Sequence, residues 1–203
     1  MSRMNRWWFV MAVAMGVAAC GGDGATEPVP TDRLHFLRVA IGVPPLANPT
    51  VSFWTHYDHD TEARIVYHAL PGVADSVTLV DFTVPSQSLS KRPDGSLLGP
   101  GDSVLVTITV IDPLQMIVRF EPSGLQFSAS NPARLRLALG TADPDLNGDG
   151  SVDGQDETLE TRLHIWRQEA TGDPWTQLRS TVDVGRGDVA ADISGFTHYA
   201  VAY

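Results

Sequence analysis

Ser103-Val-Leu-Val-Thr-Ile-Thr-Val-Ile111 is the strongest strand-forming stretch of the chain. Most of its residues are β-branched, and such residues favour the pleated, half-buried surface of a sheet. Side chains along a strand alternate between two faces, so one face of this strand is wholly apolar. That face carries Val104, Val106, Ile108 and Val110. Leu105 and Ile111 lie on the other face, which predicts that the strand is covered on both sides.

Short apolar runs of the same kind recur on both sides of this strand, between turns rich in Gly, Pro and Asp. No long segment has the 3.6-residue apolar spacing of a helix. The pattern is typical of an all-β sandwich or barrel. We predict one antiparallel domain over residues 34–203, and leave open whether residues 34–75 complete it or form a small sheet of their own. The other predicted strands are Leu34–Ile41, Val51–Tyr57, Ala63–Tyr67, Val77–Val84, Met116–Phe120, Leu125–Ser128, Arg134–Leu139, Leu163–Gln168, Thr176–Val182 and Phe196–Ala202.

Residues 51–57 and 63–67 are predicted to form a hairpin, with Asp58, His59 and Asp60 in its turn. His56 stands just before this turn, and imidazole suits zinc or copper. On an extended strand, residues three apart point to opposite faces, so His56 and His59 converge only if the turn brings them together. An exposed hairpin tip is the simpler interpretation.

A second informative stretch is Asp145-Leu-Asn-Gly-Asp-Gly-Ser-Val-Asp-Gly-Gln-Asp156. Residues with oxygen ligands stand at positions one, three, five, seven, nine and twelve. Gly150 stands at position six, where an EF-hand-type calcium loop turns sharply. Ca²⁺ is a hard cation that takes oxygen ligands in a flexible shell. Position seven would contribute its backbone carbonyl and the others their side chains; the predicted ligands are Asp145, Asn147, Asp149, Ser151, Asp153 and Asp156.

Asp156 ends this loop where Glu is usual, and the variant resembles the loop of dockerins, which also tends to end in Asp. Dockerins carry two such loops with flanking helices, and this sequence holds one. Residues 157–166 allow at most a short helical turn before they read as a strand, so we do not expect the cohesin binding of dockerins. The alternative is an acidic, solvated turn without an ion.

The N-terminus has the pattern of an export signal. Arg3 and Arg6 precede an apolar run over residues 7–19, which is shorter than the roughly 20 residues of a bilayer span. The run ends in Val17-Ala-Ala-Cys20, which resembles a bacterial lipobox with Val in place of Leu. The resemblance implies a signal peptide over residues 1–19 and lipid chains such as palmitate on Cys20. It also implies sorting to the outer membrane, because Gly rather than Asp follows. The alternative is a secretory peptide with a chance cysteine.

Residues 20–33 are rich in Gly, Pro, Thr and acids, which predicts a flexible linker between the lipid and the domain. Cys20 is the only cysteine, so no intramolecular disulfide can form, and a structural calcium would be another way to stabilise an exported fold. The formal net charge of −10 disfavours nucleic acid as a partner. We expect contact with the membrane through Cys20, and an envelope protein or a glycan as the partner, on the periplasmic or the outer side.

The second half of the chain holds five further recognisable segments. They are Phe120-Glu-Pro-Ser-Gly-Leu-Gln-Phe127, Asn131-Pro-Ala-Arg-Leu-Arg-Leu137, Ile165-Trp166, Trp175-Thr-Gln-Leu178 and Ile193-Ser-Gly-Phe-Thr-His-Tyr-Ala200. Over about residues 75–203 they resemble the ZU-five domain of ankyrins and netrin receptors. The resemblance implies an antiparallel β-sandwich that serves contact between proteins.

Some members of that family cut their own chain at a His-Phe-Ser motif, where the hydroxyl attacks the preceding peptide bond. The matching stretch is Gly195-Phe196-Thr197, in which Gly replaces the family's His. A hydroxyl nucleophile needs a base, and His198 follows the bond rather than preceding it. Self-cleavage between Phe196 and Thr197 is therefore the least favoured alternative.

Trp54, Trp166 and Trp175 suggest another alternative, a calcium-dependent carbohydrate-binding module. It requires at least two of the three exposed on one face, whereas tryptophans of a sandwich core would be buried. The sequence has no Gly-x-Ser-x-Gly elbow, no His-Glu-x-x-His motif and no phosphate-binding glycine loop. We therefore expect a protein that is not an enzyme and that serves as a structural or interaction module at the cell envelope.

Overall fold

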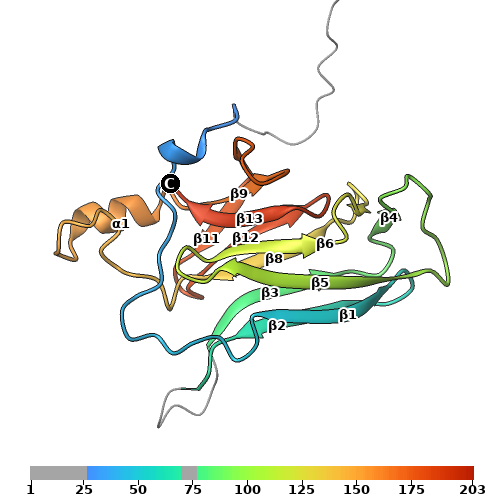
Figure 1. Cartoon of the computed structure of the whole chain (residues 1–203), viewed down its shortest axis with the longest axis horizontal. Helices are drawn as coiled ribbons and strands as arrows, with labels where there is room; N and C mark the ends of the chain where they lie inside the picture. Colours follow the sequence, from blue (N-terminus) through green and yellow to red (C-terminus); the bar gives the residue numbers. More distant parts are fainter. Residues whose placement is uncertain (1–26, 70–76) are drawn as a thin grey trace, which may run out of the picture.

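Two packed antiparallel sheets make up most of the computed structural model, which describes residues 27–69 and 77–203 (Figure 1). One sheet has the order β1 (Thr50–His56), β5 (Ser103–Asp112), β6 (Ile117–Glu121), β13 (His198–Ala202), β9 (His164–Gln168) and β10 (Thr176–Gln177). The other has the order β11 (Ser180–Asp183), β12 (Asp188–Ile193), β8 (Ala133–Ala138), β3 (Thr78–Val84) and β2 (Thr61–Val66). The all-β sandwich predicted from the sequence is confirmed.

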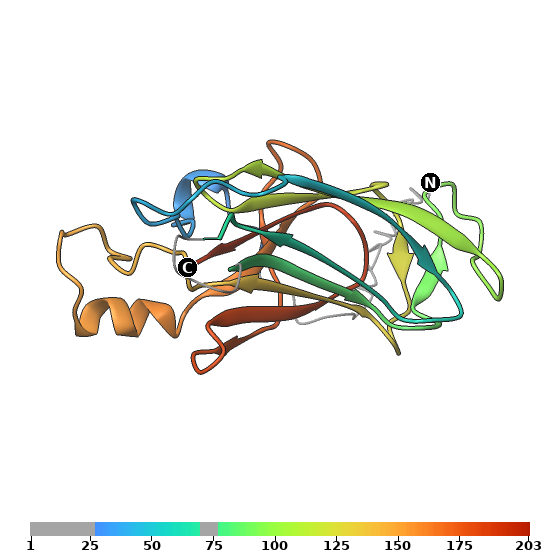
Figure 2. The same cartoon turned by 90° about the horizontal axis from the view of Figure 1, so that it is seen from below.

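The two ends of the sandwich differ. At one end lies the small sheet of β4 (Leu89–Lys91) and β7 (Gln126–Phe127), and from the other end project α1 (Gly154–Glu160) and the loop before it (Figures 1 and 2). The turn between β1 and β2 lies at the end opposite α1 (Figure 2). The loop and this turn are therefore separate places on the molecule.

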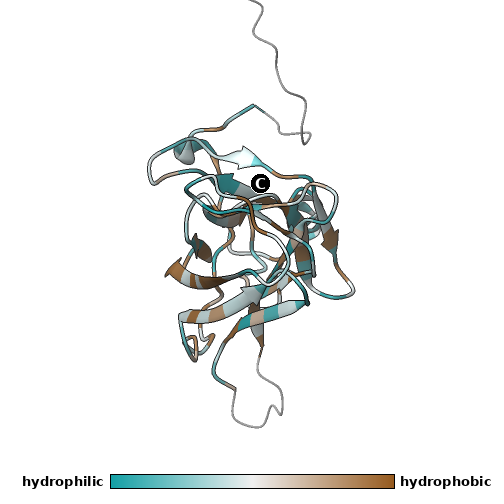
Figure 3. Cartoon of the chain, turned by 90° about the vertical axis from the view of Figure 1, so that its right-hand side faces the viewer, coloured by the Kyte–Doolittle hydropathy of each residue, from teal (hydrophilic) through white to brown (hydrophobic). Residues whose placement is uncertain are grey.

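Strand β5 shows how the apolar alternation of the sequence places the core. Its four alternating residues from Val104 to Val110 are buried between the sheets, and similar bands of brown and teal run along other strands in Figure 3. The expected cover on both sides is wrong, because Leu105 and Ile111 are 48% and 43% exposed. The N-terminal segment covers the sheet elsewhere, where Leu34 and Phe36 pack against a second buried cluster that includes Trp166.

Phe82 of β3 is the centre of the core between the two sheets. Its ring meets that of Phe120, on β6 of the opposite sheet, edge-on with centroids 5.0 Å apart. The rings of Phe127 and Phe196 lie 6.3 and 5.7 Å from it, and the side chains of Phe82, Phe120 and Phe196 are almost fully buried. Such edge-to-face pairs add to the energy of area burial. Segments that are distant in the sequence thus share one aromatic cluster.

The hairpin predicted over residues 51–67 is wrong. β1 pairs with β5 in one sheet, and β2 pairs with β3 in the other. The turn after His56 therefore carries the chain from one sheet to the other. The residues left open in the sequence, 34–69 as far as the structure describes them, belong to the same sandwich. Alternation along two neighbouring runs predicts strands, but it does not say which strands pair.

The predicted linker over residues 20–33 is too long at its C-terminal end. Val29 exchanges two backbone hydrogen bonds with Trp175, of 2.7 and 2.8 Å, and a short 3₁₀ helix, η1 (Thr31–Arg33), follows. The Trp175 indole N–H also donates to the Thr31 hydroxyl, at 3.2 Å. The expected strand Leu34–Ile41 forms only isolated bridges, at Phe36 and Val39. The folded part of the chain thus begins by Val29.

Two strands of the second sheet differ from the sequence prediction. β12 was not expected, because Val189-Ala-Ala191 is short and alanine is a weak strand former. The run Thr176–Val182 was expected as one strand, but it divides into β10 and β11, which lie in different sheets. The division into β10 and β11 arises where the chain crosses from one sheet to the other, which local propensity does not reveal.

Candidate metal centre

The twelve residues from Asp145 to Asp156 form a tight loop between β8 and α1. Gly148 and Gly150 have φ angles of +73° and +87°, in the left-handed region that residues with a Cβ rarely adopt. Gly150 is the glycine at position six of the predicted calcium loop. The loop therefore makes its sharp turn at the position that the spacing predicted.

Asp145 organises the first half of the loop. Its Oδ1 accepts hydrogen bonds from the backbone N–H groups of Gly148 and Asp149, at 2.8 and 3.1 Å. Its Oδ2 accepts one from the N–H of Gly150, at 2.8 Å. The chain thus wraps around one carboxylate, and both oxygens of position one face the inside of the turn.

Asn147 and Asp149 continue this pattern along the loop. Asn147 Oδ1 accepts from the N–H of Asp149 at 2.9 Å, and its Nδ2 donates to Asp149 Oδ2 at 3.1 Å. Asp149 Oδ1 accepts from the N–H of Ser151, at 2.9 Å. Ser151 itself is exposed, in the stretch without regular secondary structure before α1. Positions three, five and seven therefore follow one another around the turn.

Asp153 and Asp156 start the helix α1 with a reciprocal capping box. Asp153 is the N-cap, and its Oδ1 accepts from the N–H of Gln155, at 2.8 Å. Asp156 Oδ2 accepts from the N–H of Asp153 at 2.9 Å. Such a box satisfies helix N–H groups that have no partner within the helix. The expected short helical turn is in fact a helix of 7 residues.

Asp156 also closes the loop, because its Oδ1 accepts from the N–H groups of Leu146 and Asn147, at 2.8 and 3.2 Å. The carboxylate is buried. The hydrogen bond from the N–H of Asp153 is the main cause that holds the pKa of Asp156 below its ordinary value. Burial opposes this, and the N–H groups of Asn147 and Leu146 add to the lowering. Asp156 is thus a carboxylate that remains charged and joins both ends of the loop.

The structure places all six predicted ligands on this one loop. Among residues 27–69 and 77–203, however, no three His, Cys, Asp or Glu side chains lie close enough together to hold a metal ion. The carboxylates instead accept backbone N–H groups from within the loop. A site composed of carboxylate, amide and carbonyl oxygens, with one glycine turn, fits a hard cation such as Ca²⁺ by its chemistry.

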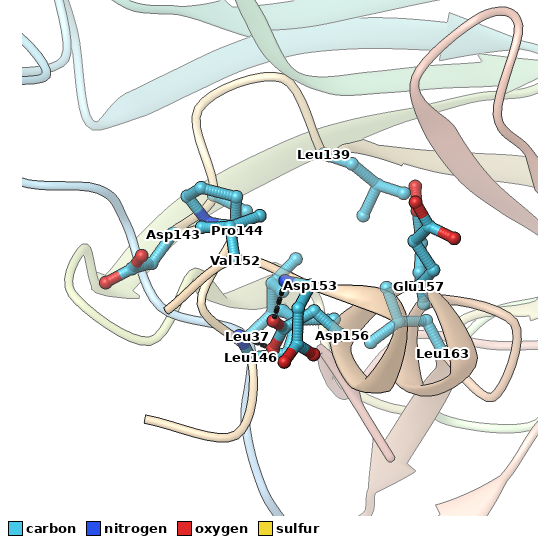
Figure 4. A pocket seen from close by; sticks show the side chains of 12 residues that line it. Leu37, Leu139, Asp143, Pro144, Leu146, Val152, Asp153, Asp156, Glu157 and Leu163 are labelled. Carbon is cyan, nitrogen blue, oxygen red and sulfur yellow. Dashed lines mark hydrogen bonds between the residues drawn. The ribbon is translucent and has the colours of Figure 1, made fainter. Parts of the chain in front are cut away.

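Two contacts attach the loop to the sandwich. The Tyr203 hydroxyl donates to the carbonyl oxygen of Leu146, at 2.5 Å, and Leu146 packs against the core. A pocket of about 210 Å³ lies between the sandwich and α1, and Leu37, Leu163 and Asp156 are among its lining residues (Figure 4). Sequence reasoning missed Tyr203, because nothing in a C-terminal tyrosine indicates a contact with a loop far earlier in the chain.

The three tryptophans do not form the aromatic face that a carbohydrate-binding module was expected to need. Trp54 is 56% exposed, but Trp166 and Trp175 are buried in a small second core with Ala200 and Ala202. The Trp166 indole N–H donates to the carbonyl of Ala202, at 3.0 Å. Two of the three rings therefore stabilise the fold rather than present a surface.

Thr197, the possible nucleophile for self-cleavage, is buried just before β13. Its hydroxyl lies against the carbonyl oxygens of Gln168 and Glu169, the latter at 3.0 Å, and donates toward them. A peptide carbonyl does not serve as the base that activates a hydroxyl. His198 follows on β13, and burial is the main cause that lowers its pKa.

The predicted signal peptide over residues 1–19, the lipidation site Cys20 and the first part of the linker lie outside the described residues. Within residues 27–69 and 77–203, no helix has the length and apolar character needed to cross a membrane. Comparisons of the chain with models of protein families, with known proteins and with solved structures found no match.

Proposed function

We propose that this chain is a non-enzymatic, lipid-anchored protein of the cell envelope, whose calcium-stabilised β-sandwich serves as a structural or interaction module. The observation that carries the calcium part is the loop in which Asp145 at position one and Asp156 at position twelve each accept backbone N–H groups. The anchor part rests on the sequence around Cys20.

The residues that would hold the ion are Asp145, Asn147, Asp149, Ser151, Asp153 and Asp156. The ion would supply a positive charge among four carboxylates on a chain with a formal net charge of −10. The residues themselves join β8, α1 and, through Leu146 and Tyr203, the end of β13. Binding to the folded loop would therefore stabilise the contact between this end of the sandwich and α1.

An exposed patch on the outer face of the six-stranded sheet supports the role in interaction. Trp54 of β1 lies directly opposite Leu105 of β5, and both side chains are about half exposed. Exposed aromatic and aliphatic side chains of this kind favour contact with a partner. The ZU-five resemblance implies the same kind of role.

The calcium part is tested by calorimetric titration of the purified protein with Ca²⁺. We expect one site in the wild type and none in the double variant Asp145→Ala with Asp149→Ala. A wild-type protein without measurable heat of binding contradicts this part. The anchor is tested separately by the intact mass of protein extracted from membranes, which should include lipid chains, and by Cys20→Ser, which should release the protein from the membrane fraction.

The carbohydrate-binding module as first expected lacks its second exposed tryptophan, so the second candidate is narrower: a sugar site with Trp54 as its single stacking ring. Next to Trp54, the hydroxyl groups of Ser52 and Thr107 lie 2.8 Å apart, and those of Thr50 and Thr109 lie 3.3 Å apart. A tryptophan face stacks on a sugar ring, and hydroxyl groups bind its polar edges. Titration with soluble glycans, followed by tryptophan fluorescence in the wild type and in Trp54→Ala, distinguishes this candidate from a partner protein.

A further inference from the structure

The turn between β1 and β2 lies at the end of the sandwich opposite the acidic loop (Figure 2), and it brings His56 and His59 together. The imidazole rings of His56 and His59 stack with their centroids 4.4 Å apart and an angle of 23° between their planes. Residues three apart on a continuous strand would point to opposite faces. The turn is therefore what places the two rings side by side.

Four hydrogen bonds hold this turn to two other segments. Asp58 Oδ2 accepts from the N–H of Gly101 at 2.7 Å, and Asp60 Oδ1 accepts from the N–H of Ser86 at 2.8 Å. The backbone of Tyr57 donates to the carbonyl of Asp102 at 3.0 Å and accepts from the N–H of Gln87 at 2.5 Å. The two imidazoles thus project from a backbone that is fixed on both sides, which lowers the entropic cost of a ligand that holds them together.

We propose that His56 and His59 together bind one divalent transition-metal cation, of the class of Zn²⁺ or Cu²⁺. Neutral imidazole nitrogen is a preferred ligand of these ions, whereas Ca²⁺ prefers oxygen. The two ends of the sandwich would thus bind different cations, a transition metal through histidine nitrogens at one end and Ca²⁺ through oxygens at the other.

The stacked rings reach a common ion by rotation about their Cβ–Cγ bonds, a torsion that is broad for histidine. One nitrogen from each ring then lies about 2.0–2.1 Å from a zinc ion, and water fills the remaining positions of the shell. Asp58 and Asp60 stand on either side of His59 in the chain and carry negative charge, which favours a cation over an anion at this turn. Both rings are at least partly accessible to solvent, so an ion has a path to them.

The test is calorimetric titration of the full chain with Zn²⁺, once with saturating Ca²⁺ present and once, without Ca²⁺, in the Asp145→Ala, Asp149→Ala background. These conditions keep the acidic loop from contributing. We expect one site that weakens at least about tenfold in His56→Gln and in His59→Gln, because each variant loses one of two ligands. His68→Gln removes an exposed histidine elsewhere and should bind like its parent.

Tryptophan fluorescence gives a second readout. Trp54 stands two residues before His56, on the same face of β1, whereas Trp166 and Trp175 are buried in the second core. Bound Cu²⁺ should therefore quench the emission of Trp54, and Trp54→Phe should lose the quenching but keep the heat of Zn²⁺ binding. Equal Zn²⁺ affinity in the wild type and both histidine variants, or no binding below millimolar Zn²⁺, would overturn the proposal.

Discussion

The hydroxyl group of Tyr203 donates a 2.5 Å hydrogen bond to the carbonyl oxygen of Leu146, which ties the last residue of the chain to the second residue of the acidic loop. The Tyr203 ring also stacks on His35 of the N-terminal segment, with centroids 5.2 Å apart. One side chain therefore joins the end of β13, the loop and the N-terminal segment. Through this contact the loop is attached to the sandwich.

Tyr203→Phe should loosen the loop without disturbing the core. Phenylalanine keeps the ring that stacks on His35, and it removes only the hydroxyl that bonds to Leu146. A net hydrogen bond contributes about 0.5–1.5 kcal/mol, so we expect a loss of stability of that order. Hydrogen exchange followed by mass spectrometry should show faster exchange in residues 145–156 and unchanged exchange in β5. Faster exchange throughout the sandwich would contradict this local role.

Gly150→Ala should destabilise the loop through backbone conformation alone. A Cβ at Gly150 meets no atom within 4 Å, but the φ angle of +87° is unfavourable for alanine by about 1–2 kcal/mol. Gly154→Ala is the matched control, because its Cβ also has open space and its φ angle is ordinary for an L-residue. Urea unfolding should show a lower free energy of unfolding for Gly150→Ala, and little change or an increase for Gly154→Ala. Equal effects would mean that the turn does not need glycine.

The sequence predicted the glycine turn of the loop and the order of its acids because both features are local. Glycine at position six and acids at fixed spacing leave few other backbone paths, and alternation along β5 fixes which side chains enter the core. Other features depend on distant segments. The pairing of β1 with β5, the bond from Tyr203 to Leu146 and the stacking of His56 on His59 follow from how the chain returns on itself, which spacing along the sequence does not encode.

The candidate site residues also divide into those within one local segment and those from distant segments. The six oxygen-bearing residues share one loop because they belong to one continuous segment, but among the described residues no three carboxylates or histidines come close enough together to hold a metal ion. Trp54, Trp166 and Trp175 come from three segments, and the sequence did not reveal which of them are buried. The N-terminal segment packs against Trp166 and Trp175, and its Val29 pairs with Trp175 although its composition resembles a linker.

Phe82→Ala should cost about 3–5 kcal/mol of unfolding free energy, because it removes the centre of a buried aromatic cluster and leaves a cavity. The four rings around Phe82 come from β1 and β6 of the opposite sheet, from β7 and from the segment before β13, which limits how far the site can collapse. Leu105→Ala, on the outer face, should cost roughly 0.5 kcal/mol or less. Chemical unfolding of both variants measures the difference, and similar losses would contradict the assignment of the core.

The stability of the folded protein should fall as the pH decreases below about 6.5, the ordinary pKa of histidine. Burial lowers the pKa of His164, and it is the main cause that lowers the pKa of His198. The unfolded chain therefore takes up protons at these residues before the folded protein does, and the stability present above pH 6.5 is lost as the pH falls toward the folded pKa values. In His198→Gln, the free energy of unfolding in urea should depend less on pH between pH 7 and pH 5 than it does in the wild type. An unchanged slope would contradict this assignment.

Thermal unfolding of the protein in Ca²⁺ and then in chelator tests the central claim most directly. A ligand that binds only the folded form stabilises it by about 2.7 kcal/mol at a hundredfold excess over its dissociation constant. We predict a higher unfolding temperature in Ca²⁺ for the wild type, and no Ca²⁺-dependent shift for Asp145→Ala with Asp149→Ala, whatever that variant's own stability. Identical wild-type unfolding curves in Ca²⁺ and in chelator would contradict the account, and the acidic loop would then be a solvated turn.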